Sequence, residues 1–202
     1  RAGLRIFGPS RLASEIEGSK AFSKDLMARH DIPTARYMKF ADPLKARAHV
    51  EAMRPPFVVK ADGLAAGKGV VICSAKDAAI EAIEAIMVRK VFGPSGARIV
   101  IEEFLEGEEA SFLAITDGKT VIPLAAAQDH KAIYDGDRGP NTGGMGAYSP
   151  APLITPDIEH EVMEKVMKPA VAAMEAEGRP YKGALYAGLM IGAGGLKVLE
   201  FN

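Results

Sequence analysis

The sequence contains no tryptophan and only one cysteine, Cys73. A single cysteine excludes an internal disulfide and a zinc site built from several thiolates, and it is typical of proteins from a reducing cytosol. Cys73 ends an apolar run, so we expect it to lie in a hydrophobic core.

The sequence has almost no net charge and no long apolar run. The formal net charge of −1 argues against a nucleic-acid partner, because proteins that neutralise many phosphates usually carry a clear excess of Lys and Arg. The longest continuous apolar stretch, residues 121–127, is far shorter than the roughly 20 residues that cross a bilayer. We therefore expect a soluble, cytoplasmic chain with no membrane partner.

The length of 202 residues fits one medium domain or two small subdomains. The sequence begins at Arg1 in what reads as the middle of a domain, and it stops directly after an apolar run. We expect it to be part of a longer protein whose other segments contribute to function.

Four segments have the apolar spacing of helices, residues 14–30, 42–53, 74–90 and 155–177. Asp42 and Ser74 are the expected N-caps of the second and third. Strands are predicted at residues 57–60, 70–73, 99–102, 110–116, 120–126, 183–191 and 196–201. Asp117-Gly118 is a strong hairpin signal, whereas residues 135–152 show no periodicity and are expected to form a long loop. Several hairpins without strict βαβ alternation predict the α+β, or mixed α/β, class.

The glycine-rich segment from Lys60 to Val70 joins two predicted strands and contains a second lysine, Lys68. Glycines allow close approach of the backbone to a phosphate, and the lysines supply compensating charge. The spacing excludes a Walker A loop, because three residues rather than four separate Gly63 from Gly67, and Gly69 follows the lysine. A flap over a polyphosphate and an ordinary glycine-rich hairpin both remain open.

Five acidic residues lie between positions 102 and 109. Such a run is usually a solvated face. Here Phe104-Leu105 forms an apolar interruption between two strands, so this hinge would also suit a purine edge, with a nearby carboxylate for the ribose hydroxyls.

The chain ends in Glu200-Phe201-Asn202. Alternation along a strand places Glu200 and Asn202 on one face and Phe201 on the other. Two adjacent oxygen ligands suit Mg²⁺, which completes its shell with phosphates and water, although a polar strand end explains the pattern equally well.

A further polar group comprises residues 128–131 and the glycine-rich residues 139–150. Its free N–H groups suit a small polar ligand. His130 is either a general base or a structural residue, and the sequence favours the second.

Together these segments resemble the ATP-grasp superfamily and, within it, the phosphoribosylamine glycine ligases, also called glycinamide ribonucleotide synthetases. The matching stretches occur in the family's order, and the most specific is residues 139–150. The resemblance implies an ATP-grasp fold with two subdomains that hold the nucleotide between antiparallel sheets. It assigns residues 1–34 to the end of an N-terminal domain and a linking helix, 35–105 to a lid subdomain and 106–202 to a truncated central subdomain.

The resemblance also implies a reaction. ATP phosphorylates the carboxylate of glycine, and 5-phosphoribosylamine attacks the acyl phosphate to give glycinamide ribonucleotide, ADP and phosphate in purine biosynthesis. The implied cofactors are ATP and Mg²⁺, with Mn²⁺ as an alternative metal. Another ATP-grasp carboxylate-amine ligase and a non-catalytic nucleotide-binding module are the competing functions.

The family's functional positions carry over to named residues. Its catalytic positions correspond to Lys20, Lys60, Lys68, Asp129 and Lys131. The flap over the phosphates includes Gly63, Gly67 and Gly69, adenine and ribose are read by Glu102, Phe104, Leu105 and Glu109, and Mg²⁺ is bound by Glu200 and Asn202. Asp129 and Lys131 lie on the side of glycine and 5-phosphoribosylamine together with Asn141, Thr142, Gly143 and Gly144. The resemblance does not extend to most of the family's N-terminal domain or to its C-terminal domain, which this sequence does not contain. Turnover by this segment alone is therefore not expected.

Overall fold

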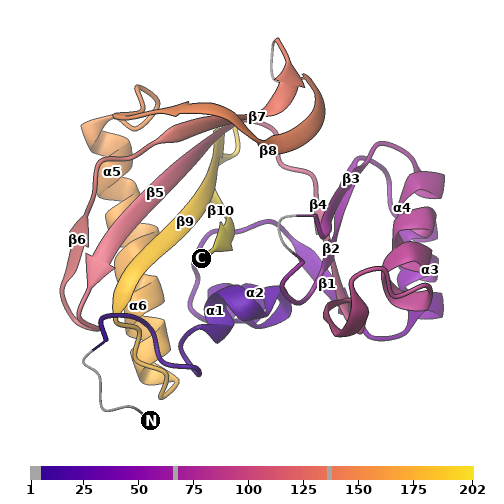
Figure 1. Cartoon of the computed structure of the whole chain (residues 1–202), viewed down its shortest axis with the longest axis horizontal. Coiled ribbons are helices and arrows are strands. Elements are labelled where there is room, and N and C mark those ends of the chain that lie inside the picture. Colours follow the sequence, from indigo (N-terminus) through magenta and orange to yellow (C-terminus); the bar gives the residue numbers. More distant parts are fainter. Residues whose placement is uncertain (1–5, 66–67, 136–137) are drawn as a thin grey trace. The chain divides into compact units, whose positions relative to one another are not determined.

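A computed structural model of the chain describes residues 6–65, 68–135 and 138–202 (Figure 1). Within these residues the strands form two four-stranded sheets and a two-stranded ribbon, and every strand pairing is antiparallel. The predicted mixture of helices with antiparallel sheets is confirmed.

The chain divides into two compact units. The first comprises Arg1–Ser14, His30–Pro33 and Glu106–Asn202, and the second comprises Glu15–Arg29 and Thr34–Leu105. The subdomain limits expected from the resemblance, at residues 1–34, 35–105 and 106–202, stay a prediction for this chain.

The second unit is a four-stranded sheet with helices. The strand order is β1 (Tyr37–Phe40), β4 (Ile99–Glu103), β2 (Phe57–Ala61) and β3 (Val70–Cys73). The helices are α1 (Glu15–Gly18), α2 (Lys20–Arg29), α3 (Pro43–Ala52), α4 (Lys76–Ile83), the π-helix η1 (Glu84–Val88) and the 3₁₀-helix η2 (Gly93–Gly96).

One face of this sheet packs into an apolar core with α3, α4 and η1. Phe57, Val59 and Ile101 contribute from the sheet, and Val50 and Ile83 from the helices. The core also contains Cys73, as predicted, and burial raises the pKa of its thiol. The lone cysteine is therefore a core residue rather than a reactive one.

The helix caps of this unit follow the predictions in part. The Asp42 side chain accepts hydrogen bonds from the backbone N–H groups of Leu44 and Lys45, so the predicted cap of α3 is confirmed. The predicted Ser74 cap is wrong, because α4 begins after Ala75 and has no side-chain cap.

The helix predicted over residues 14–30 is confirmed for most of its length, but it forms as two helices, α1 and α2, that are separated at Ser19. The Ser19 hydroxyl there accepts a hydrogen bond from the N–H of Phe22 at 3.1 Å. This side chain starts a second helix instead of continuing the first.

The first unit contains the other four-stranded sheet, in the order β10 (Gly195–Phe201), β9 (Gly183–Gly192), β5 (Glu108–Thr116) and β6 (Val121–Pro123). A long helix of α5 (Pro156–Val162), the π-helix η3 (Met163–Met167) and α6 (Lys168–Ala176) lies along one face of it (Figure 1). The buried residues between them include Phe112, Leu189 and Phe201 from the sheet and Val166 and Met174 from the helix.

The predicted hairpin at Asp117-Gly118 is confirmed between β5 and β6. The Asp117 carboxylate accepts from the N–H groups of Lys119 and Thr120, and Gly118 has a φ of +98°. Such a turn is fixed by adjacent residues, so local sequence suffices to predict it.

The prediction of a long loop over residues 135–152 is wrong for most of its length. Strand β8 (Arg138–Tyr148) pairs with β7 (Gln128–Tyr134) in the two-stranded ribbon. Strand pairing uses backbone groups, and a glycine-rich strand in a narrow ribbon does not need the apolar alternation of a strand with one buried face.

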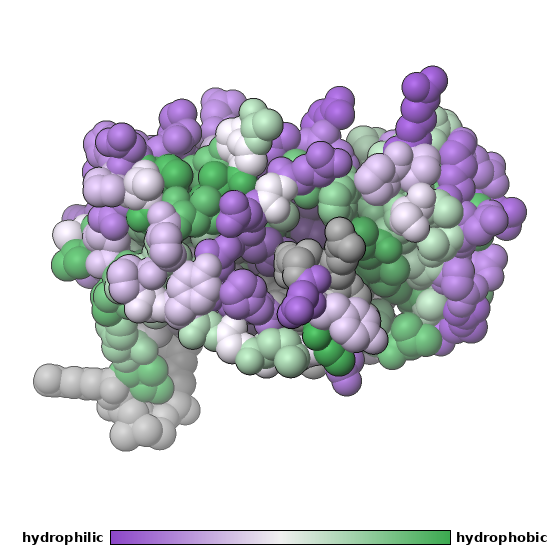
Figure 2. All heavy atoms as spheres, turned by 90° about the horizontal axis from the view of Figure 1, so that it is seen from above, coloured by the Kyte–Doolittle hydropathy of each residue, from purple (hydrophilic) through white to green (hydrophobic). Residues whose placement is uncertain are grey.

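No helix in the described part of the chain is long and apolar enough to cross a membrane. On the face drawn in Figure 2, apolar side chains form several separate groups among hydrophilic ones.

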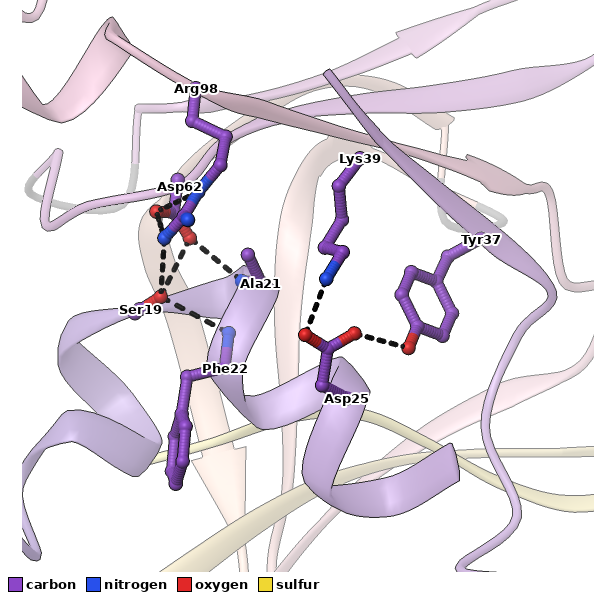
Figure 3. Close-up of polar contacts among 8 residues, drawn as sticks. All are labelled: Ser19, Ala21, Phe22, Asp25, Tyr37, Lys39, Asp62 and Arg98. Carbon is purple, nitrogen blue, oxygen red and sulfur yellow. Dashed lines mark hydrogen bonds and ion pairs between the residues drawn. The ribbon is translucent and has the colours of Figure 1, made fainter. Parts of the chain in front are cut away.

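In the second unit, Asp25 of α2 links the helix to β1 (Figure 3). Its carboxylate accepts from the hydroxyl of Tyr37 at 2.7 Å and from the ammonium of Lys39. Partial burial acts to raise the pKa of Asp25, but the hydrogen bonds from Lys39 and Tyr37 outweigh it and hold the pKa below its ordinary value.

We expect Asp25→Asn to lower the free energy of unfolding at pH 7 by about 1 kcal/mol. A lowered pKa in the folded state gives stability that is present above the unfolded pKa of about 3.9 and is lost as the pH falls further. Urea unfolding at pH 7 and pH 3 measures this, and the difference between the two proteins should be smaller at the lower pH. A difference that is the same at both pH values would contradict this account.

Candidate functional site

The predicted site residues are divided between the two units. In the second unit, Lys60 of β2 and Glu102 of β4 share one face of the sheet, because Lys60 pairs with Val100 and Glu102 with Val58. The ammonium of Lys60 lies 3.1 Å from Glu102 Oε2, and the two side chains are only 6% and 2% exposed. The structure therefore joins two predicted residues in a buried ion pair.

A second lysine, Lys24 of α2, completes this cluster. Its ammonium lies 3.0 Å from the same Glu102 Oε2 and donates to Thr34 Oγ1 at 2.7 Å. Its side chain is 2% exposed. Lys24 was not predicted from the sequence. The signal for it is its position three residues after Ala21 and three before Met27, both of which are buried, so that a charge lies on the apolar side of the helix.

The two oxygens of Glu102 differ sharply. Oε2 meets both ammonium groups, whereas Oε1 is buried and has no hydrogen-bond partner among the described residues. An unsatisfied carboxylate oxygen is costly inside a protein. A ligand that brings an N–H group would satisfy it.

Apolar side chains lie on the same face of the sheet. Val70 pairs with Lys60 and Ile72 with Val58, and these two side chains of β3 are 40% and 57% exposed. Exposed apolar groups beside a buried ion pair suit a flat, amine-bearing ring. The alternation of exposed Val70 and Ile72 with buried Cys73 is the signal that could have identified them.

The glycine-rich loop starts with Gly63 and closes at Gly69. A side-chain carbon on Gly63 would lie 2.7 Å from Ser95 Oγ and 2.9 Å from its Cα, and one on Gly69 would lie 2.6 Å from the Cβ of Ala65. Close packing therefore requires glycine at both positions, whatever role they have toward a phosphate. Lys68 is exposed, and Gly67 lies outside the described residues.

Asp62 fixes the base of this loop to the start of α2 (Figure 3). Its Oδ1 accepts from the Ser19 hydroxyl at 2.9 Å and from the N–H of Ala21 at 2.7 Å, and its Oδ2 from Arg98 Nη2 at 2.6 Å. Lys20 also contacts the base of the loop. Its backbone N–H donates to the Asp62 carbonyl at 2.9 Å, and its ammonium donates to the Gly63 carbonyl at 3.4 Å. Asp62 is a second site residue that the sequence analysis missed.

We expect Asp62→Asn to destabilise the second unit by about 2 to 3 kcal/mol, because an amide cannot serve both the helix N–H and the guanidinium of Arg98. Urea unfolding followed by circular dichroism measures this. Asp77→Asn, in the exposed first turn of α4, is the matched control. Equal stability of the two variants would show that the Asp62 contacts contribute nothing specific.

In the first unit, Glu200 and Asn202 lie on the sheet face opposite the core. Glu200 pairs with Gly188, and Asn202 exchanges backbone hydrogen bonds with Tyr186 at 2.7 and 3.0 Å. Phe201 between them is buried, at 2% exposure. The predicted alternation is confirmed, even though a bulge separates Val198 from Glu200.

The same face carries hydroxyl groups. Ser111 also pairs with Gly188, and its Oγ lies 3.2 Å from the hydroxyl oxygen of Tyr186. A side chain at Gly188 would contact Tyr186 and would approach Glu200 Cγ to 3.6 Å. Glu109 follows the same alternation two residues before Ser111 and is partly buried. Carboxylate and amide oxygens side by side are a donor set that fits Mg²⁺.

The remaining predicted residues lie mainly in the ribbon. Asp129 is partly buried on β7, which also includes Lys131, and β8 includes Asn141 and Gly143. Thr142 Oγ1 accepts from the N–H of Gly144 at 3.0 Å. The backbone of the ribbon is described, but the side chains of Lys131 and Asn141 are not.

Gln128 and Tyr148 join the two strands of this ribbon at one end. The Tyr148 hydroxyl donates to Gln128 Oε1 at 2.5 Å, and the Tyr148 ring lies 5.6 Å from the ring of His130. The structural role that the sequence favoured for His130 stays a prediction.

Phe104 and Leu105 follow β4 and precede β5, and both are partly buried. The second unit ends at Leu105 and the first resumes at Glu106. The predicted apolar interruption between two strands therefore occurs where the chain leaves one unit for the other.

Comparison with known proteins decides the family. Residues 18–202 match the family described as phosphoribosylglycinamide synthetase, ATP-grasp (A) domain. The chain belongs to this ATP-grasp family. The resemblance stated from the sequence is thereby confirmed.

Relatives of the ATP-grasp domain share its whole length. The chain is 57% identical over 202 residues to a phosphoribosylamine glycine ligase of Vibrio vulnificus, and 58% identical to that of Allochromatium vinosum. Each match covers 100% of this chain but only 47% of the relative. The chain therefore spans about half the length of these relatives.

Solved structures agree with the fold. The crystal structure of a phosphoribosylamine glycine ligase from Thermotoga maritima matches with a TM-score of 0.88 and 39% identity, over 98% of this chain and 50% of that one. A D-alanine–D-alanine ligase from Bacillus anthracis, at 21% identity and a TM-score of 0.69 over 99% of this chain and 61% of that one, shares the fold alone. The predicted ATP-grasp fold is confirmed.

Proposed function

We propose that this ATP-grasp domain is the ATP-binding part of a phosphoribosylamine glycine ligase. In that reaction the γ-phosphoryl group of ATP is transferred to a carboxylate oxygen of glycine, which releases ADP. The amine of 5-phosphoribosylamine then attacks the carbonyl carbon of glycyl phosphate, a C–N bond forms, and phosphate leaves. The identity of 57–58% to ligases of this name supports the choice of substrates.

One observation carries the nucleotide part of the proposal: the buried Lys60–Glu102 pair beside the exposed side chains of Val70 and Ile72. The apolar side chains would contact the adenine ring, and Glu102 Oε1 would accept from its amino group. Lys60, with Lys20 and Lys68, would contact the phosphates. Phosphoryl transfer depends on such charge compensation rather than on a protein nucleophile.

Glu200 and Asn202 would hold Mg²⁺ or Mn²⁺. A divalent cation bound there would neutralise charge on the transferring phosphoryl group. Glu109 would bind the ribose, and Asp129, Lys131, Asn141 and Thr142 would serve glycine and 5-phosphoribosylamine. A biotin carboxylase domain from Hydrogenobacter thermophilus, whose solved structure contains ADP with magnesium, has the same fold at 20% identity and a TM-score of 0.72.

Two experiments test the proposal. Isothermal titration calorimetry with the 202-residue chain should detect ATP binding in the presence of Mg²⁺, and no binding would overturn the nucleotide assignment. For the reaction, a chimaera would carry these residues in place of the matched 202 residues of the Vibrio vulnificus ligase. Phosphate release by the chimaera should require both glycine and 5-phosphoribosylamine, and release that needs only one of them would point to a different ligase.

A further inference from the structure

Lys24 belongs to no part of the proposed reaction, yet it is a fully buried cation on a helix. Its ammonium contacts Glu102 Oε2 at 3.0 Å and Thr34 Oγ1 at 2.7 Å. We infer that Lys24 is a positioning residue that orients the Glu102 carboxylate for recognition of the amino group of adenine. The inference rests on the proposed ATP-binding function.

Two lysines hold one oxygen of the Glu102 carboxylate. Both ammonium groups contact Glu102 Oε2, and the Lys24 ammonium also donates a hydrogen bond to Thr34 Oγ1. With two cations on one oxygen, the carboxylate holds Oε1 apart from both of them. That oxygen is the buried atom that lacks a partner among the described residues, so the orientation imposed by the lysines leaves an acceptor for a ligand.

The position of Lys24 on α2 strengthens this role. Lys24 follows Lys20 by four residues, so both side chains lie on one side of the helix, about 6 Å apart along its axis. Lys20 donates to the carbonyl of Gly63 at the base of the loop, and Lys24 contacts Glu102 on the sheet. Asp62 accepts hydrogen bonds from Ser19 and Ala21 at the start of α2, and these contacts hold the helix that contains both lysines.

Removing the Lys24 charge should leave Lys60 as the remaining ion-pair partner of Glu102 among the contacts described above, and the carboxylate should be freer to turn. The consequence is a loss of discrimination rather than a uniform loss of binding. Inosine triphosphate is the probe, because it carries a carbonyl oxygen where ATP carries the amino group. A fixed carboxylate oxygen repels that carbonyl and accepts from the amine.

Isothermal titration calorimetry with Mg²⁺ would compare ATP and inosine triphosphate on the wild-type chain, on Lys24→Met and on Lys45→Met. Lys45 is an exposed lysine of α3 and serves as the matched control. We expect the wild type and the Lys45 variant to prefer ATP by roughly tenfold or more, and the Lys24 variant to lose most of that preference. A purely structural role of Lys24 would lower both affinities and leave their ratio unchanged.

Each failure has a distinct meaning. If the wild-type chain does not bind ATP, the proposed function and this inference both fall. If the wild type prefers ATP and Lys24→Met keeps the same ratio, the inference alone is overturned. If circular dichroism shows that Lys24→Met does not fold, Lys24→Gln, which keeps an N–H donor without the charge, decides the question by the same ratio.

Discussion

Replacing Glu200 with glutamine in the chimaeric ligase is expected to lower the Mg²⁺-dependent rate on the order of 100-fold, which corresponds to about 2.7 kcal/mol of barrier. Glutamine keeps the shape of the side chain but removes the negative charge that would hold a divalent cation. The fold should persist, because Glu200 is only partly buried and the sheet at this strand is maintained by backbone pairing with Gly188.

The measurement is a Mg²⁺ titration of phosphate release. Excess metal should partly rescue Glu200→Gln, since a weakened metal site can still be filled at higher concentration. Glu108→Gln is the matched control. Glu108 is an exposed carboxylate of β5 in the same unit, and strand alternation places it on the other face of the sheet from Glu200. Full activity of the Glu200 variant at limiting Mg²⁺ would remove Glu200 from the metal site and leave a polar strand end.

Features fixed by adjacent residues could be predicted from the sequence. The Asp42 cap, the Asp117-Gly118 hairpin and the alternation of Glu200 and Asn202 each depend on a few neighbouring positions. The Ser74 cap failed although it is local, because the helix starts one residue later and the cap is Ala75. Local patterns therefore identify elements more securely than their ends.

The ribbon and the ion cluster could not be predicted in the same way. Strand β8 forms by backbone pairing with β7, and its glycine-rich sequence has no apolar alternation that would indicate a strand. Lys24 and Glu102 meet only because α2 packs beside β4, a contact between segments far apart in the chain. Glu102 and Lys60 could be identified as site residues from the family resemblance. The orientation of the Glu102 carboxylate could be found only from the three-dimensional structure.

Lys60→Met is the second substitution with a large expected effect. It should weaken binding of Mg²⁺-ATP to the 202-residue chain on the order of 50-fold, about 2.3 kcal/mol, because an ammonium–phosphate contact is lost and methionine offers no donor. The fold should survive, since methionine has a similar volume and Glu102 retains Lys24 as a partner at 3.0 Å.

The pattern of specificity separates this variant from Lys24→Met. Lys60 would contact the phosphates, which ATP and inosine triphosphate share, so Lys60→Met should weaken the binding of both nucleotides. Most of the preference for ATP should remain, because Lys24 still holds Glu102 Oε2 at 3.0 Å. The salt dependence of the remaining affinity should also decrease, because one charge contact has been removed. Calorimetry at two salt concentrations, with Lys45→Met as control, measures both effects. Unchanged affinity for both nucleotides would mean that Lys60 serves only as a counter-ion to Glu102, and the phosphates would then have to be bound by Lys20 and Lys68.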